Sequence, residues 1–128
     1  MRVFKNAWFS KFAAKEKISD EALCEAVKRA QLGLIDADLG GGVIKQRVAR
    51  PGSGRSGGFR TLVFFRARSR AVFAFGFAKN DQANIGGKDE RELKDAAKIV
   101  LGLSEEMVDR QLAAGRFQEV MCDAQAST

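Results

Sequence analysis

The chain has 128 residues, 45% of them hydrophobic and 30% charged, which is typical of one folded domain and excludes a disordered chain. Lysine and arginine total 22 against 16 acidic residues, so the formal charge is +6. Histidine and tyrosine are both absent. Their absence excludes Ser-His-Asp and Cys-His nucleophilic sites, paired-histidine ribonuclease chemistry and metal sites that need imidazole.

The cysteine content and the hydropathy pattern bear on where the protein works. Cys24 and Cys122 are too few for a disulfide scaffold or a zinc ribbon, and we expect two reduced thiols. Lys5 and Lys11 interrupt the N-terminal apolar residues, which argues against a signal peptide. The longest apolar run, residues 71–78, is too short for a membrane span. We therefore expect a soluble, cytoplasmic protein with no membrane partner, metal or small-molecule cofactor.

The first third of the chain predicts a strand and then helices. Residues 2–9 favour a short strand, after which aromatic residues follow at helical spacing. Ser19 or Asp20 is a suitable N-cap for a helix with one apolar side, and Gly33 is a suitable end for it. Residues 36–42, which end in three glycines, are expected to form a loop.

The middle of the chain predicts three strands. Residues 43–49 alternate between cationic and apolar side chains, and residues 59–66 and 71–79 follow as two more strands joined by a hairpin turn. On the third strand, strict alternation places three aromatic side chains on one face, where we expect them in the core: Phe73, Phe75 and Phe77.

The last third predicts two helices and a strand. Asp89 and Glu92 resemble a capping pair for a helix that Gly102 closes. Ser104 is a suitable cap for another short helix, and residues 117–121 favour a final short strand.

The basic residues are concentrated in this middle region. No acidic residue lies between Leu39 and Asn80, where nine lysines and arginines occur. An ordinary solvated face mixes both signs, so unmixed cations indicate a polyanionic partner. Arginine predominates among them, and its planar fork suits phosphate. The alternative is a basic surface that serves only solubility.

A glycine-rich segment lies inside the basic region. Residues 52–57 match the pattern GxGxxG, but they lie between two predicted strands, whereas a dinucleotide site needs a strand and a helix. The chain is also too short for a kinase fold. We interpret residues 50–58 as a flexible loop that can follow a phosphodiester backbone closely. Within it, Arg50 and Arg55 are candidate RNA contacts.

Cations at the predicted strands and strand ends are the candidate catalytic groups. These candidates are Lys45, Arg47, Arg60 and Lys79. Alternation of side chains along each strand permits the four to converge on one concave face. The alternative is four scattered, exposed cations. RNA cleavage needs a base for the ribose 2′-OH, cations for the phosphate and an acid for the leaving 5′-oxygen. Because histidine and tyrosine are absent, lysine, arginine or carboxylates must supply these groups.

The order of these segments resembles the RelE/HigB-like toxins of bacterial toxin–antitoxin pairs. A Lys45-x-Arg47 strand is followed by a glycine loop, then Gly57-Gly58-Phe59-Arg60 opens the next strand, and Phe77-Ala78-Lys79-Asn80 ends the third before a helix. The resemblance is closest to the HigB-type branch and covers residues 43–101 best.

The resemblance implies an α+β fold, in which a small antiparallel or mixed sheet is packed by N-terminal and C-terminal helices. It also implies a single RelE-like domain over residues 1–128. We expect its core at about residues 1–103, a helical C-terminal extension at residues 104–121 and a loose tail at residues 122–128.

The resemblance further implies a toxin that cuts messenger RNA on the ribosome, independently of metal, and that a cognate antitoxin inactivates. By position, Lys45 and Arg47 match the strand cations that serve as base and charge stabiliser, Arg60 matches the arginine on the scissile phosphate, and Lys79 is a cation at the strand end. Arg50, Arg55 and Arg66 are the expected RNA contacts. Several members use a tyrosine after that last strand, and this chain has none.

Two other functions stay open. The first is non-catalytic: a basic module that binds nucleic acid, or a toxin of the same fold that inhibits a protein target such as gyrase. The missing tyrosine and histidine favour it. The second is a structural protein that assembles through its apolar strand surface, in which case association would be insensitive to salt, unlike phosphate binding.

Overall fold

The computed structural model describes residues 1–50, 54–78 and 87–122. These residues form strands and helices in the order β1 (Arg2–Asn6), α1 (Ala7–Glu16), α2 (Asp20–Gln31), β2 (Ala37–Gly40), β3 (Val43–Arg50), β4 (Gly54–Arg66), β5 (Arg70–Ala78), α3 (Gly87–Leu101), α4 (Glu105–Ala113) and β6 (Phe117–Val120). None of these helices combines the length and the apolar character that crossing a membrane requires.

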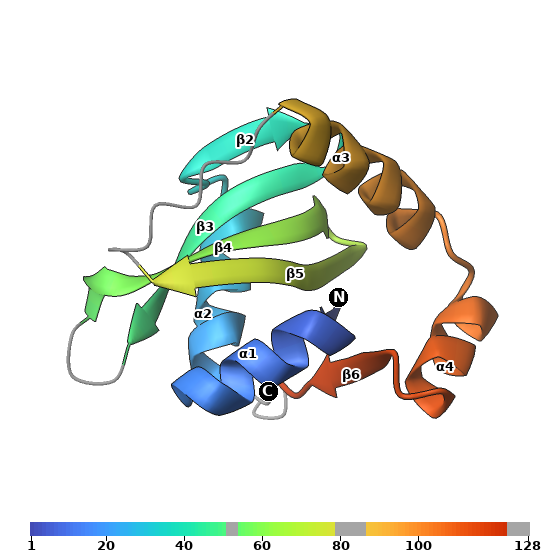
Figure 1. Ribbon diagram of the computed structural model, residues 1–128, viewed down its shortest axis with the longest axis horizontal. Helices are drawn as coiled ribbons and strands as arrows, with labels where there is room; N and C mark the ends of the chain where they lie inside the picture. The colour runs from blue at the N-terminus through green and yellow to red at the C-terminus, as the bar shows by residue number, and fades with distance from the viewer. Residues whose placement is uncertain (51–53, 79–86, 123–128) are drawn as a thin grey trace.

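The six strands form one sheet in the order β2-β3-β4-β5-β1-β6 (Figure 1). Strand β1 runs parallel to β5, and the other neighbouring strands are antiparallel. The expected α+β class with a mixed sheet is confirmed. Strand β6 pairs with β1, so the segment that we expected as a helical extension also adds an edge strand to the sheet.

Helices α1 and α2 pack on one face of the sheet. The apolar side of α2 is buried there against the β3 residues Ile44 and Val48. The hydroxyl of Ser19 accepts a hydrogen bond from the backbone N–H of Ala22 and so caps α2, as its position before the apolar stripe predicted. The predicted first strand is shorter than expected because Asn6 caps α1, which places the aromatic residues that follow in a helix.

Helices α3 and α4 contribute to the core on the other face. Ala97 and Leu101 of α3 and Val108 of α4 are buried with Leu62 of β4 and Val72 of β5. The predicted apolar stripe of α3 therefore lies in the core. The hydroxyl of Ser104 accepts from the backbone N–H of Met107 and caps α4, as predicted.

A β-bulge at Ala74 corrects the prediction for the phenylalanines of β5. Leu62 pairs with Phe75 but Val63 pairs with Phe73, so one extra residue lies in β5. The extra residue inverts the alternation. Phe73 is buried on the α1 and α2 face, whereas Phe75 packs on the other face, so the prediction of one shared face is wrong. The Asn6 amide donates to the Ala74 carbonyl oxygen (3.2 Å) and stabilises the bulge.

Two predicted loops are partly strands. Within residues 36–42, Ala37–Gly40 form the edge strand β2. A strand of four residues is too short for alternating polar and apolar side chains to be recognised in the sequence. Strand β4 begins at Gly54, so much of the predicted glycine loop is extended chain. Glycine is required at position 58, because a Cβ atom there would lie 2.0 Å from the Val48 carbonyl oxygen.

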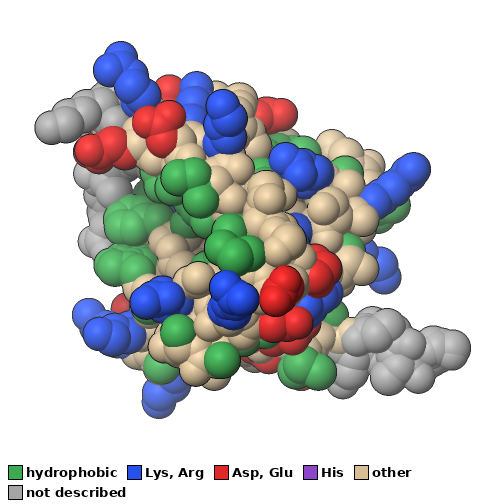
Figure 2. All heavy atoms as spheres, turned by 90° about the vertical axis from the view of Figure 1, so that its right-hand side faces the viewer, with side chains coloured by type: hydrophobic (Ala, Val, Ile, Leu, Met, Phe, Trp, Pro, Cys, Tyr) green, Lys and Arg blue, Asp and Glu red, His purple; other side chains and the backbone are tan. Residues whose placement is uncertain are grey.

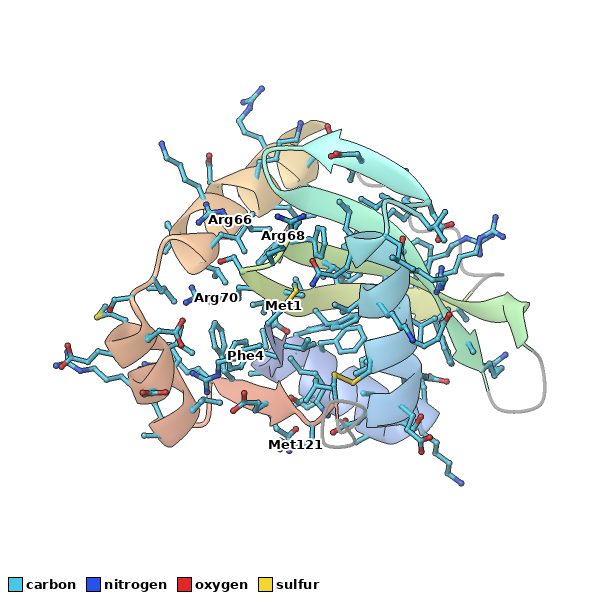
Figure 3. The ribbon with its side chains drawn as sticks, turned by 180° about the vertical axis from the view of Figure 1, so that it is seen from behind. Met1, Phe4, Arg66, Arg68, Arg70 and Met121 are labelled. Atoms are coloured by element: carbon cyan, nitrogen blue, oxygen red, sulfur yellow. A yellow bond between two sulfur atoms is a disulfide. The ribbon has the colours of Figure 1, made fainter. Side chains whose placement is uncertain are left out.

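A disulfide between Cys24 and Cys122 corrects the prediction of two reduced thiols (Figure 3). Cys24 lies in α2, and Cys122 follows β6, with 5.6 Å between their Cα atoms. The pairing of β6 with β1 brings Cys122 to α2, where the Asp20 carboxylate also accepts from the Met121 backbone N–H (3.1 Å). A separation of 98 residues carries no sign of this contact in the sequence.

An ion-pair network joins the two ends of the chain. The Arg2 guanidinium donates to Glu119 of β6 and to Glu105 of α4, each at 2.9 Å. Glu105 also accepts from Arg70 of β5 at 2.8 Å. These hydrogen bonds hold the pKa of Glu119 below its ordinary value, chiefly through Arg2, and the pKa of Glu105 below its ordinary value, chiefly through Arg70. Figure 2 views the α3 and α4 side and shows acidic and basic side chains intermixed on it.

The lowered pKa of Glu119 predicts a pH-dependent contribution to stability. A carboxyl whose pKa is depressed by folding stabilises the folded protein above its unfolded pKa, about 4.3, and loses this effect as the pH falls through the folded value. We expect Glu119→Gln to lower the unfolding temperature at pH 7 and to change it much less near pH 3. Thermal unfolding followed by circular dichroism at both pH values is the measurement. An equal loss at both would show that the ion pair is not responsible.

Candidate functional site

Strand register places three of the predicted cations on one face of the sheet. Arg47, Arg60 and Phe77 lie opposite one another on β3, β4 and β5. In the adjacent row, Lys45, Leu62 and Phe75 are opposite one another. Residues directly opposite share a face, and residues two apart on a strand are about 7 Å apart. We call Lys45, Arg47 and Arg60 the cation cluster; it lies on the face that carries α3.

Buried hydrogen bonds on the other face of β3 fix the direction of these cations. The Gln46 amide, 1% exposed, donates to the carbonyl oxygens of Ala26 and Leu34 at 3.0 Å. The Thr61 hydroxyl donates to the Gln46 carbonyl oxygen at 2.8 Å. Because side chains alternate along a strand, anchoring Gln46 toward α2 directs its two neighbours, Lys45 and Arg47, to the opposite face.

The side chains of the cation cluster form no ion pair within the described residues. At the backbone, the Arg47 N–H donates to the Asp36 carboxylate (2.6 Å). Arg47 and Arg60 are direct cross-strand neighbours, and like charges in that position destabilise a sheet. The Arg60 Nη1 atom is buried and has no hydrogen-bond partner in this part of the chain, which costs about 1–3 kcal/mol. Local conflicts of this kind are typical of binding sites.

The other predicted site residues do not join this cluster. Arg50 lies with its guanidinium 4.8 Å from the ring centre of Phe59, whose side chain is in the core on the α1 and α2 face, and 3.7 Å from the Glu16 carboxylate. Arg66 donates to the carbonyl oxygen of Leu101 at the end of α3 (2.9 Å) and lies six residues, roughly 20 Å, from Arg60 along β4.

The two remaining predicted residues lie at the borders of the described ranges. Arg55 belongs to β4, and the structure does not describe its side chain. Lys79 lies outside the described residues.

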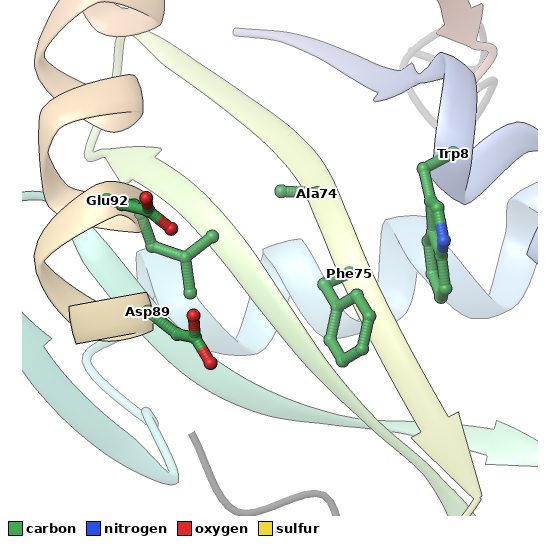
Figure 4. A pocket seen from close by; sticks show the side chains of 6 residues that line it. Trp8, Ala74, Phe75, Asp89 and Glu92 are labelled. Atoms are coloured by element: carbon green, nitrogen blue, oxygen red, sulfur yellow. The ribbon is translucent and has the colours of Figure 1, made fainter. Parts of the chain in front are cut away.

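A hollow beside the cation cluster was not predicted from the sequence. Trp8, Ala74, Phe75, Asp89, Glu92 and Leu93 line a space of about 430 Å³ (Figure 4), which we call the aromatic hollow. Helix α3 begins at Gly87, so Asp89 lies inside the first turn, and the predicted capping role is wrong. As residues three apart on a helix, Asp89 and Glu92 share one side of it.

The sequence carried a signal for the aromatic hollow. Trp8 is the only tryptophan of the chain, and it is 44% exposed.

Acidic, cysteine and histidine side chains form no group of three or more that could hold a metal ion in the described ranges.

The comparison with known families decides what the chain is. A sequence model described as the RelE toxin of the RelE / RelB toxin-antitoxin system matches residues 1–120. This chain belongs to the RelE toxin family. It is therefore the toxin component of a toxin–antitoxin pair, and its cognate partner is a RelB-type antitoxin. The RelE-family match spans every described strand, including β6. No curated protein matches the chain significantly.

Proposed function

We propose that this RelE-family toxin is a ribosome-dependent endoribonuclease that cuts messenger RNA in the cytoplasm, with no metal ion in the reaction. The observation that carries the proposal is the cation cluster. Three cationic side chains share one face of the sheet, without carboxylate partners among the described residues. A bound phosphodiester would neutralise the repulsion between Arg47 and Arg60, which lie directly opposite one another.

The reaction would proceed through the ribose 2′-hydroxyl. Its oxygen attacks the adjacent phosphorus as the proton leaves to a base, and the bond from phosphorus to the 5′-oxygen breaks. The products are a 2′,3′-cyclic phosphate and a 5′-hydroxyl. We assign Lys45 and Arg47 to base and charge stabilisation and Arg60 to the scissile phosphate. The leaving 5′-oxygen takes its proton from Lys79, a ribosomal group or water.

The remaining arginines have a smaller part in this proposal. Arg55 belongs to the basic segment at the start of β4, and we assign it to the RNA backbone. Arg50 and Arg66 already have partners within the protein. Their contacts to RNA would require these partners to be exchanged, so we expect them to contribute less to binding.

Primer extension on a translated message tests the proposal. The toxin is induced in cells that carry a reporter message and a matched reporter without a start codon. We expect new 5′ ends in the translated reporter only. If growth stops while both reporters stay intact, the toxin has another target, such as gyrase. The absence of tyrosine and histidine from the chain favours that second function.

A further inference from the structure

We propose that the aromatic hollow binds one unstacked nucleobase of the same RNA and selects bases that carry an amino group, guanine most strongly. This inference rests on the proposed function for its biological setting. The site itself is a base-binding site whose test does not require cleavage. It is formed by α1, β5 and α3, none of which contributes a member of the cation cluster.

The aromatic side chains provide a rigid stacking surface. The ring centres of Trp8 and Phe75 are 4.5 Å apart, and Trp8 also stacks on Phe12 at 5.3 Å with an interplanar angle of 18°. These contacts hold the indole in place while 44% of Trp8 stays exposed. Exposed aromatic rings held in a groove are a usual means of binding unpaired bases, because every base has a π-face.

Asn6 positions the stacking surface. Its side-chain oxygen accepts from the Phe9 backbone N–H (2.8 Å) and starts α1, while its amide donates to the carbonyl oxygen of Ala74 in the β5 bulge. One side chain therefore ties the first turn of α1, which carries Trp8, to the bulge that turns Phe75 to this face of the sheet. The two aromatic rings are brought together by these local contacts.

The carboxylates supply the selectivity. Asp89 and Glu92 project from α3 on the side of the aromatic hollow opposite Trp8, with Phe75 between them (Figure 4). A carboxylate only accepts hydrogen bonds, and it repels phosphate. Beside a binding site for a polyanion, these groups therefore suit the donor edge of a base. Guanine presents an N–H and an amino group side by side, which match the two oxygens of one carboxylate.

The position of the aromatic hollow allows one RNA strand to occupy both sites. Phe75 lies in the same cross-strand row as Lys45, and its ring centre is 6.2 Å from that of Phe77, in the row of Arg47 and Arg60. A base over Phe75 therefore lies next to the row that would hold the phosphate. The volume of about 430 Å³ is within the range of roughly 300–1,000 Å³ for small-molecule pockets.

Tryptophan fluorescence provides a direct test. Trp8 is the only tryptophan and tyrosine is absent, so the emission reports on the aromatic hollow alone. The purified protein is titrated with guanosine, inosine and uridine 5′-monophosphates, which share one phosphate and differ in the base. We expect saturable quenching by the guanine nucleotide, binding about tenfold weaker for inosine, which lacks the amino group, and weaker still for uridine. Equal binding of all three would overturn the proposal.

Substitutions on α3 distinguish a specific role of the Glu92 carboxylate in binding the base from a general effect of removing negative charge. Glu92→Gln should remove most of the preference for guanosine over inosine monophosphate. Asp95→Asn is the matched control, because Asp95 is an exposed acid of the same helix that does not line the aromatic hollow. An unchanged preference in Glu92→Gln, or an equal loss in Asp95→Asn, would overturn the proposal. Circular dichroism shows that each variant is folded.

The test distinguishes this inference from the proposed function. Selective quenching without cleavage in cells would retain the base site and reject the nuclease. Cleavage in cells without selective quenching would retain the nuclease and reject the base site.

Discussion

Replacing Arg60 with methionine is expected to slow messenger cleavage by roughly 10²–10³-fold, the usual cost of removing one group that stabilises transition-state charge, without making the fold less stable. Arg60 has a buried nitrogen without a partner in the described residues and lies directly opposite Arg47. Removing both conflicts leaves stability unchanged or raises it by about 0.2–1 kcal/mol. Substitutions that raise stability while lowering activity are typical of residues in binding sites.

The measurements are primer extension for cleavage and urea unfolding for stability. Arg116→Met is the matched control, because Arg116 is an exposed arginine that precedes β6, on the far side of β5 from β4 in the strand order. We expect this control to cut at the wild-type rate. Wild-type cleavage by Arg60→Met would reject Arg60 as a phosphate contact. A fall in its stability by more than 1 kcal/mol would instead show that Arg60 has a structural role.

Loss of the disulfide between Cys24 and Cys122 is expected to lower the free energy of unfolding by about 4–5 kcal/mol. The bond closes a segment of 98 residues, and the chain-entropy model gives this value for a loop of about that length. Urea unfolding with and without a thiol reductant measures the effect.

The double variant Cys24→Ala with Cys122→Ala controls for other actions of the reductant. It should be as unstable as the reduced wild-type protein and should not respond to reductant. If wild-type protein unfolds at the same urea concentration in both conditions, the disulfide does not contribute to stability.

Sequence patterns predicted the elements whose signals are local. The helices begin at or next to Ser19 and Ser104 because a hydroxyl in front of an apolar stripe satisfies the first free backbone N–H groups. The position of Lys45 and Arg47 on the face opposite Ile44 was predicted by simple alternation along an uninterrupted strand.

The features that were missed depend on contacts between distant segments. The bulge at Ala74 is stabilised by Asn6, 68 residues away, so strict alternation predicted the wrong face for Phe75. The disulfide depends on the pairing of β6 with β1. The aromatic hollow combines three elements that only the folded chain brings together.

The candidate site was predicted only in part, because alternation along a strand is a local signal, whereas the register between strands is not. Alternation permitted Lys45, Arg47 and Arg60 to share a face but left scattered cations as the alternative, and the register of β3 with β4 brings them to one face. Arg50 has the parity of Ile44 and Val48 on β3, and its side chain lies on their face with Phe59. It was predicted to belong to the glycine loop and not to the strand, so alternation was not applied to it.

The place of β1 in the sheet affects how the toxin is made. Strand β1 lies between β5 and β6, and both of these strands are synthesised much later than β1. Pairings between such distant segments form slowly, since a long loop must close before they contribute. A nascent chain therefore cannot complete this sheet until β6, the last of the described strands, has been synthesised.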